Sequence, residues 1–447
     1  MLVLLLVAPA LPISAQPLPP VVEAAVRTLP IGLGETVQRL ADGEQLVGVT
    51  WTEGQPQVEV RWRTPSGWTA WEAAEPDDAL DPADRERTRP GTEPVWRPRG
   101  ADVVAVRVAG QARGLELVRV GDGQVRDGGL TFGLPRADAA VRRHHLGVVH
   151  TRAEWGADER MRRSAPSYAS SVRAVVVHHT AGGNDYRPEE VPARLRADYA
   201  YHVRSRGWSD LGYNLVVDRF GRVWEGRAGG IDRAVIGTHA AGFNTGTLGV
   251  SVMGDYTRTT ATRGVVDALS RVSAFAAWRW RFDPRGSVRM TSGGSPRYRA
   301  GTVVTLPRVH GHRDTGRTAC PGSLQDRLPD VRQRAAVRLW GPPVLQALSV
   351  TGSPVHAPQP LVVDARLSRP VAWEVRVEES GGQIVVRRGG RSARPQLSWN
   401  GMRPLGPVPV PALPGEYRWV VLWDDGVHGL QRRAGRLTVS TPVVRVP

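Results

Sequence analysis

The feature that most constrains this chain is a short apolar run that ends in two adjacent histidines, VRAVVVHHTAGG at residues 172–183. Three consecutive valines between polar residues are typical of a buried strand, so the histidines stand where a rigid core ends. Because side chains alternate across a strand, His178 points to the same face as Val176, and His179 points to the opposite face. Only one of the two histidines is therefore expected to join a given metal site.

A second run with metal-ligating side chains, VHGHRDTGRTACPG, lies far downstream and contains His310, His312 and Cys320. Cys320 is the single cysteine of the chain, so an internal disulfide is excluded. One thiolate with two imidazoles is a typical zinc ligand set that leaves a fourth position open for water. The two runs together predict a catalytic zinc site rather than a structural one.

The chain is strongly basic, with a formal charge of +16 over 447 residues, and all 59 basic residues are arginine. A basic protein is attracted to polyanions such as nucleic acid, anionic lipid or the acidic polymers of a cell wall. The arginines are scattered, and the sequence holds no zinc-finger or RNA-recognition motif, so nucleic acid is not an expected partner.

The N-terminal residues predict export followed by a linker. Residues 1–15 combine an apolar stretch with small residues before a cleavage point after Ala15, which is typical of a secretory signal peptide and too short to span a bilayer. We expect a secreted or cell-wall protein with no transmembrane segment in the mature chain; the alternative is an apolar first strand. Residues 16–36 are proline-rich and are expected to form an irregular linker.

Short alternating runs separated by Gly, Pro and Asp predict an all-β sandwich over residues 37–135. Its aromatic residues admit two interpretations, a carbohydrate platform or ordinary packing, and we favour packing. These residues are Trp51, Trp62, Trp68, Trp71 and Trp96. Residues 136–147 are expected to be a second linker. A further series of short strands over residues 341–447 predicts a second β-sandwich, with attachment, spacing or wall binding as its candidate roles.

Between the two sandwiches, residues 148–340 mix strand and helix patterns. Helices are expected near residues 187–207, 264–282 and 323–340, because apolar side chains recur there with helical periodicity. In the first helix the recurring residues are Val191, Leu195, Tyr199 and either His202 or Val203. The pattern predicts a central α/β domain, a mixed β-sheet flanked by helices, with the metal site on loops at one edge of the sheet.

Five blocks of this central domain resemble the peptidoglycan recognition protein family, which shares its fold with type 2 N-acetylmuramoyl-L-alanine amidases. The blocks are WGADE, VVVHHTAG, YHVRSRGWSDLGYNLVVDRFGRVWEGR, GTHAAGFNTGTLGVSVMGDY and GHRDTGRTACPG. The resemblance implies one Zn²⁺ per chain, held by His178, His312 and Cys320. It also implies that Tyr213 and Thr318 are catalytic residues. Tyr213 is the expected catalytic tyrosine, and Thr318, at a position that is lysine in phage enzymes, is expected to orient the substrate carbonyl. The N-terminal sandwich resembles the accessory domain of secreted actinobacterial wall amidases, and the C-terminal one an immunoglobulin-like module.

Other polar and aromatic residues of the central domain are assigned supporting roles. The expected substrate contacts are His239, Asn244 and Trp208. The expected partners of a ligand imidazole are Asn214 and Asp314. Glu225 is expected to be either a general base or the partner of Arg227 in an ion pair. His179, His202 and His310 are expected to be packed or hydrogen-bonded structural histidines.

The resemblance implies an enzyme that uses zinc to hydrolyse the amide between N-acetylmuramic acid and the L-alanine of the peptide stem. Its partner would be peptidoglycan, with anionic wall polymers as further partners. The alternative is a protein that binds muropeptides without cutting them. Family members of that kind typically lack a zinc ligand, often the cysteine, so the presence of Cys320 and Tyr213 favours the enzyme.

Overall fold

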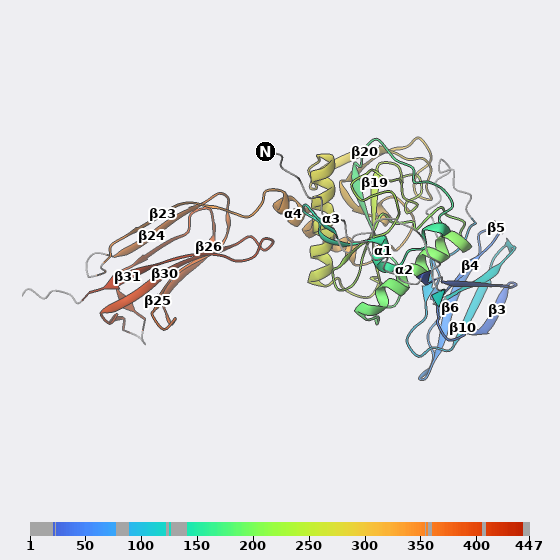
Figure 1. The fold of residues 1–447 in the computed structure, drawn as a ribbon, viewed down its shortest axis with the longest axis horizontal. Coiled ribbons are helices and arrows are strands. Elements are labelled where there is room, and N and C mark those ends of the chain that lie inside the picture. The colour runs from blue at the N-terminus through green and yellow to red at the C-terminus, as the bar shows by residue number, and fades with distance from the viewer. Residues whose placement is uncertain are drawn as a thin grey trace, which may run out of the picture. The chain divides into compact units, whose positions relative to one another are not determined.

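The computed structural model describes residues 21–22, 24–76, 89–121, 125–126, 141–353, 355, 360–404 and 408–440. The predicted signal peptide, residues 1–15, lies outside these ranges. The chain divides into two compact units, Met1–Gln333 and Arg334–Pro447 (Figure 1). Within the described ranges, no helix combines the length and apolarity needed to cross a membrane.

Two antiparallel sheets enclose the apolar core of the N-terminal β-domain, as the alternating runs predict. The strands are β2 Ala25–Pro30, β3 Gly34–Arg39, β4 Glu44–Thr50, β6 Gln57–Thr64, β7 Gly67–Trp68, β8 Glu72–Ala73, β9 Val95–Trp96, β10 Val103–Ala109 and β12 Glu116–Gly121. One sheet has the order β3-β10-β6-β7, with β8 also paired to β6, and the other has the order β2-β12-β4-β9. The inward face of β6 shows why these residues form a sheet, because Val58, Val60 and Trp62 alternate into the core.

Both regions expected to be linkers contain strands, and those expectations are corrected for the described residues. Residues 16–36 include β2 and the start of β3, and residues 136–147 include β14, Val141–Arg143, and the first residue of β15, Gly147–His150. Both β2 and β14 lie at the edge of their sheets. An edge strand covers little of the core and tolerates proline at its end, so its apolar pattern is weak.

The tryptophans of the N-terminal β-domain separate into two groups. Trp51, Trp62 and Trp96 are at most 4% exposed, so the packing interpretation is confirmed for them. Trp68 and Trp71 lie nearer the surface and stack with arginine. The guanidinium of Arg61 lies 4.6 Å from the ring centre of Trp68 and 4.4 Å from that of Trp71.

A seven-stranded mixed sheet forms the centre of the α/β domain, in the order β14-β15-β18-β17-β19-β16-β22. The remaining strands are β16 Ala174–His179, β17 Leu215–Val217, β18 Val223–Glu225, β19 Thr247–Val252 and β22 Val309–Gly311, and a separate hairpin joins β20 Ser287–Thr291 to β21 Val303–Pro307. The helices are α1 Arg152–Trp155, α2 Val191–Ala200, α3 Arg263–Trp280 and α4 Leu324–Leu339. The predicted mixed sheet with helices is therefore present. Helices α2 and α4 fall within their predicted regions, and α3 begins one residue before its predicted region.

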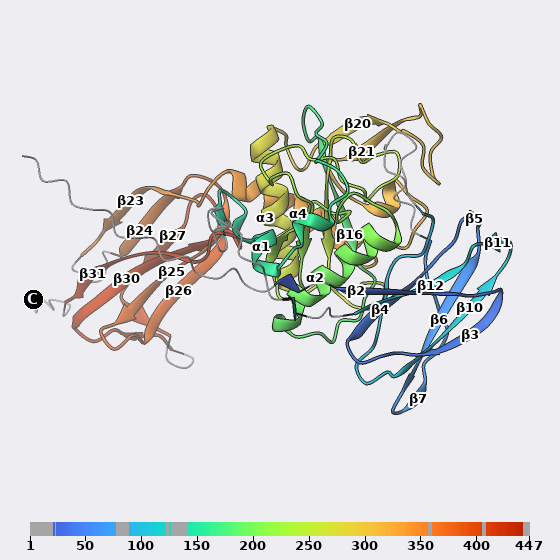
Figure 2. The same cartoon turned by 45° about the vertical axis from the view of Figure 1, so that its right-hand side comes forward.

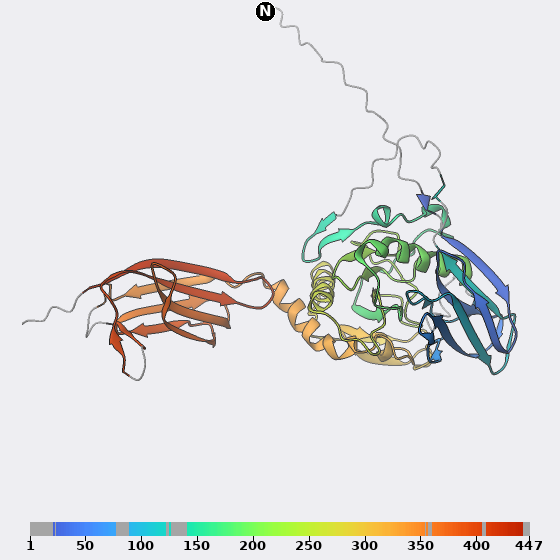
Figure 3. The same ribbon diagram turned by 90° about the horizontal axis from the view of Figure 1, so that it is seen from below.

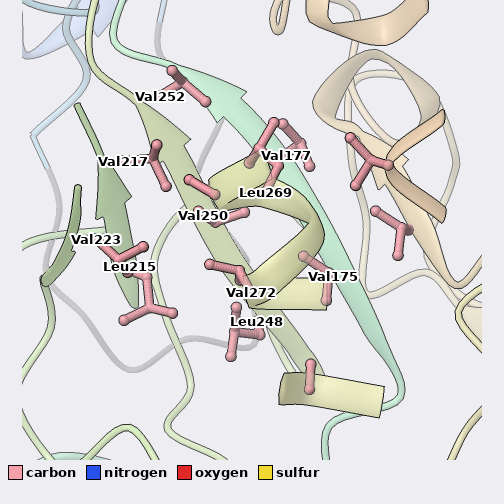
Figure 4. Close-up of a cluster of buried hydrophobic side chains, with 14 of the residues drawn as sticks. Val175, Val177, Leu215, Val217, Val223, Leu248, Val250, Val252, Leu269 and Val272 are labelled. Carbon is pink, nitrogen blue, oxygen red and sulfur yellow. The ribbon is translucent and has the colours of Figure 1, made fainter. Parts of the chain in front are cut away.

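Strand β16 alternates as the sequence predicts. Val175 and Val177 pack with Leu269 and Val272 of α3 in the main core (Figure 4). Val176 instead packs in a second cluster that includes Phe243. His178, two residues after Val176, therefore leaves the sheet on the face turned away from α3.

The N-terminal β-domain packs directly on α2 and on the π-helical turn Tyr201–Ser205 that continues it (Figures 2 and 3). Leu46, Trp96, Val118 and Val120 of the β-domain share one apolar cluster with Ala197, Ala200 and Tyr201. The fully buried Tyr201 donates a hydrogen bond to the carbonyl of Thr92, 2.8 Å away. Opposite it, a Cβ on Gly48 would lie 2.2 Å from the tyrosine oxygen, so this strand position admits only glycine without a shift.

A buried carboxyl in this interface gives a testable pH dependence. Burial raises the pKa of Asp198 on α2 to about 7, although the positive charge of Arg194 lowers it. The folded protein therefore keeps the proton that the unfolded chain releases above its pKa of 3.8, and stability falls as the pH rises from 4 to 7. A pKa difference of one between the folded and unfolded states is worth about 1.4 kcal/mol. We expect the free energy of unfolding of the wild type to be a few kcal/mol lower at pH 7.5 than at pH 4.5, and Asp198→Asn to abolish this loss. Urea unfolding at the two pH values measures both. An unchanged pH slope in this variant would contradict the assignment.

The C-terminal unit contains two antiparallel sheets over one apolar core. Its main strands are β23 Leu345–Thr351, β24 Leu361–Leu367, β25 Val371–Glu379, β26 Ile384–Ser392, β27 Gln396–Trp399, β30 Gly415–Asp424 and β31 Gln431–Val439. The orders are β23-β24-β27 and β26-β25-β30-β31. The boundary between the units falls inside α4, after Gln333, rather than at the expected residue 340.

Candidate metal centre and catalytic cleft

Three metal-ligating side chains converge at one edge of the central sheet. His178 is near the end of β16, His312 directly follows β22, and Cys320 precedes α4. Because β16 and β22 are parallel neighbours, their carboxyl ends meet at the same edge. One ligand atom from each residue lies within 4.8 Å of the other two, and all three side chains are buried.

The donor set fits zinc. The Sγ atom of Cys320 lies 3.9 Å from Nδ1 of His178. Two ligands of a tetrahedral zinc ion are separated by roughly 3.5 Å when each metal bond is about 2.0–2.3 Å long. The backbone N–H of His179 also donates to this sulfur at 3.3 Å, which favours the thiolate that a metal requires. Two imidazoles and one thiolate are thus held close to the spacing of a zinc site.

The environment keeps the ligand imidazole of His178 neutral. Burial, followed by the neighbouring imidazoles of His312 and His239, lowers the pKa of His178 well below its usual value. A metal binds the neutral ring, so this lowered pKa favours binding. Nδ1 of His239 lies 3.0 Å from Nε2 of His178, and burial lowers the pKa of His239 to about 3. His239 is 2% exposed and contacts a candidate metal ligand, which corrects its expected role as a substrate contact.

The other histidines singled out in the sequence have structural contacts, as expected. Nδ1 of His179 accepts a hydrogen bond from the N–H of Tyr256, and burial lowers the pKa of His179 to about 4. Nδ1 of His310 lies 2.8 Å from the carbonyl oxygen of Pro307. His202 stacks on Trp208 with ring centres 4.4 Å apart. None of the three belongs to the metal cluster found among the described residues.

Tyr213 lies beside the cluster, as the resemblance implies. Its ring centre is 5.3 Å from that of His178, and its side chain is 7% exposed. Two expected substrate contacts lie elsewhere. Trp208 is 2% exposed beneath its stack with His202, and Asn244 is fully buried, where its side chain accepts the N–H groups of His239 and Ala240. Both hold the local fold, so their expected roles are corrected.

The expected partners of the ligand imidazoles, Asn214 and Asp314, form other hydrogen bonds in this structure. The Asn214 amide bridges the N–H of Gly249 and the carbonyl of Val235. Asp314 accepts from the N–H of Gly311 and from the amide of Gln325, so it fixes the turn that carries His312. Burial raises the pKa of Glu225, whose charged neighbours are Arg152, Glu159 and Arg143 rather than Arg227 or the metal cluster. The structure does not bring Glu225 to the site.

A carboxylate from the N-terminal β-domain contacts Thr318. The Thr318 hydroxyl donates to Oε2 of Glu75 at 2.6 Å, and the N–H of Ala319 donates to Oε1 at 3.3 Å. A hydroxyl has one proton, and in this structure Thr318 gives it to Glu75. The expected role of Thr318 toward a substrate carbonyl stays a prediction. Nothing in the sequence pattern around Glu75 signalled this contact, because the two residues are 243 positions apart.

Two family models match the chain. The model described as N-acetylmuramoyl-L-alanine amidase matches residues 168–323, a range that includes the three candidate ligands, Tyr213 and Thr318. The model described as Rv3811 N-terminal galactose-binding domain-like matches residues 9–126.

Known proteins similar to this chain cover its central part. Peptidoglycan-recognition protein SC2 of Drosophila simulans is 32% identical over 179 residues, which are 40% of this chain and 83% of that protein. Peptidoglycan recognition protein 1 of Bos taurus is 30% identical over 182 residues, which are 39% of this chain and 79% of that protein. Among solved structures, the N-acetylmuramoyl-L-alanine amidase LysC from Clostridium intestinale URNW is 20% identical, with a TM-score of 0.28, and the match covers 39% of this chain and 91% of that one.

Proposed function

This chain belongs to the family of peptidoglycan recognition proteins and type 2 amidases, and from that premise we propose that it is a zinc-dependent N-acetylmuramoyl-L-alanine amidase. The observation that carries the proposal is the convergence of His178, His312 and Cys320 beside Tyr213. Its substrate is peptidoglycan, and its place of action is the wall outside the cell. Anionic wall polymers are further partners for a chain of charge +16.

The chemical demand of the reaction matches this donor set. An amide is hard to hydrolyse because its carbonyl is a poor electrophile and water is a poor nucleophile. When bound, zinc supplies the Lewis acidity that activates both. His178, His312 and Cys320 would hold one ion per chain, and the contact with His239 fixes the ring of His178 for that purpose.

Tyr213 has the chemistry to complete the site. Its phenol carries one O–H donor, and its ring centre lies 5.3 Å from that of His178. Charge would develop on the attacked carbonyl oxygen beside this candidate ligand. A donor held in place before the reaction stabilises that charge at little reorganisation cost. The surrounding burial lowers the local dielectric and strengthens this interaction.

Product analysis tests the proposal. Zinc-loaded protein incubated with purified sacculi should release stem peptides that begin with a free L-alanine amino terminus, with no new reducing sugar ends. The same protein after chelation should release none, and added zinc should restore the reaction. New reducing ends would identify a glycosidase, and amino termini of other residues an endopeptidase. Tight muropeptide binding without either product would identify a recognition protein.

A further inference from the structure

The N-terminal β-domain forms one wall of a cavity of about 290 Å³ beside the metal cluster. Residues Glu75 and Val95 of the β-domain line this cavity together with His312, Thr318 and Cys320 of the α/β domain. Both domains belong to the same compact unit. The cleft is therefore built by two domains, from residues such as Glu75 and Thr318 that are 243 positions apart in the sequence.

A chain of hydrogen bonds connects this wall to a metal ligand. Glu75 accepts the Thr318 hydroxyl and the Ala319 N–H through its two carboxylate oxygens. The same hydroxyl oxygen accepts the N–H of Cys320 at 3.0 Å. Hydrogen bonds to a carboxylate are among the stronger ones in proteins. The conformation of the backbone that presents Cys320 thus depends on a side chain from the other domain.

The backbone of Glu75 is itself held in place. The N–H of Ala74 donates to Val58 of β6, and the N–H of Glu93 donates to the carbonyl of Glu75, both at 2.8 Å. The β-domain in turn shares a buried apolar cluster with α2 and its π-helical turn. Glu75 is therefore presented to the Cys320 loop from a supported position rather than from a free loop.

We propose that Glu75 is a positioning residue of the metal centre, which acts through Thr318 to orient Cys320, so that the N-terminal β-domain completes the cleft. In this arrangement the Thr318 hydroxyl links the Glu75 carboxylate to the backbone N–H of Cys320. The effect on metal binding stands on the contacts themselves, and only the effect on turnover rests on the proposed function. Residues that orient metal ligands in this way typically contribute about 10- to 100-fold to metal affinity or activity.

The test measures zinc affinity and turnover in the full chain. We expect Glu75→Ala to raise the zinc dissociation constant at least about tenfold, in competition with a chromophoric chelator, and to lower kcat on a soluble muropeptide. Glu75→Gln keeps one acceptor and should recover part of the loss. Thr318→Ser keeps the hydroxyl and should resemble the wild type, whereas Thr318→Val should resemble Glu75→Ala. The double variant Glu75→Ala/Thr318→Val should bind zinc no more weakly than the single variant with the lower zinc affinity. Both substitutions act through one contact, so their effects should not add.

A matched control and the unfolding curves make the outcome decisive. Glu59→Ala removes another carboxylate of the β-domain, which pairs with Arg107 and does not line the cavity, and should change neither readout. Thermal unfolding identifies any variant that fails to fold, and Glu75→Gln then carries the test. Zinc affinity of the Glu75 variants equal to that of the control, or additive losses in the double variant, would overturn the proposal. A wild type that releases no L-alanine termini, combined with weakened zinc in Glu75→Ala, would refute the proposed function and leave the positioning role standing.

Discussion

Cys320→Ser is expected to lose most of the bound zinc and, with it, hydrolysis of peptidoglycan. Cys320 supplies the only sulfur of the cluster, and its Sγ lies 3.9 Å from Nδ1 of His178. A serine hydroxyl at neutral pH is a far weaker ligand than a thiolate, and it is too short to keep the same metal distance. Since residues that merely orient ligands contribute about 10- to 100-fold, loss of a ligand should weaken zinc binding by more than about a hundredfold. Metal analysis after dialysis against a weak chelator measures this directly.

A histidine outside the cluster provides the control for this variant. His150 lies at the end of β15 and stacks on Trp224, with ring centres 4.2 Å apart. His150→Ala should retain about one zinc per chain under the same dialysis. Stoichiometric zinc in Cys320→Ser would show that the ligand set is wrong, whatever happens to activity.

The second large effect is expected from Tyr213→Phe, which should keep zinc and muropeptide affinity but slow turnover. The ring remains beside His178, so packing is retained, and only the O–H donor is removed. Loss of one donor at a developing oxyanion costs on the order of 3 kcal/mol, or roughly a hundredfold in kcat. Single-turnover kinetics on a soluble muropeptide, with zinc content measured on the same sample, separate this effect from metal loss.

Tyr199→Phe is the matched control for the tyrosine variant. The Tyr199 hydroxyl donates to the carbonyl of Asp158 at 3.2 Å, away from the cluster. Its loss should lower stability by about 1 kcal/mol and leave kcat unchanged. A Tyr213→Phe enzyme with wild-type kcat would remove the tyrosine from the chemistry, and parallel losses of zinc and kcat would give it a structural role instead.

The parts of the fold that were predictable are those with a strong periodic pattern. On β16 the two-residue alternation sends Val175 and Val177 into the core with α3 and leaves His178 on the opposite face, as observed. On α2 the recurrence of Val191, Leu195 and Tyr199 marks the face that is fully buried. Such patterns are readable because burial of one face imposes the spacing on the chain.

Edge strands and long-range polar contacts were not predictable from the same patterns. The strand β2 is paired on one side only and buries little, so its sequence resembles a linker. Asn244 and Trp208 belong to the sequence blocks that resemble the family. Both side chains are nevertheless buried and make their contacts within the local fold. The contact of Glu75 with Thr318 depends on how two domains dock, which no local spacing encodes.

The wide separation of the interacting residues has a consequence for the order of folding. His178 and Cys320 are 142 positions apart, and Glu75 and Thr318 are 243 apart. A chain folds its early domains during synthesis, and contacts that close long loops form slowly. We therefore expect the N-terminal β-domain and most of the central sheet to form before the Cys320 loop docks. We then expect metal capture at the proposed zinc site to come last, so that the proposed amidase activity would begin only after the first unit is fully assembled.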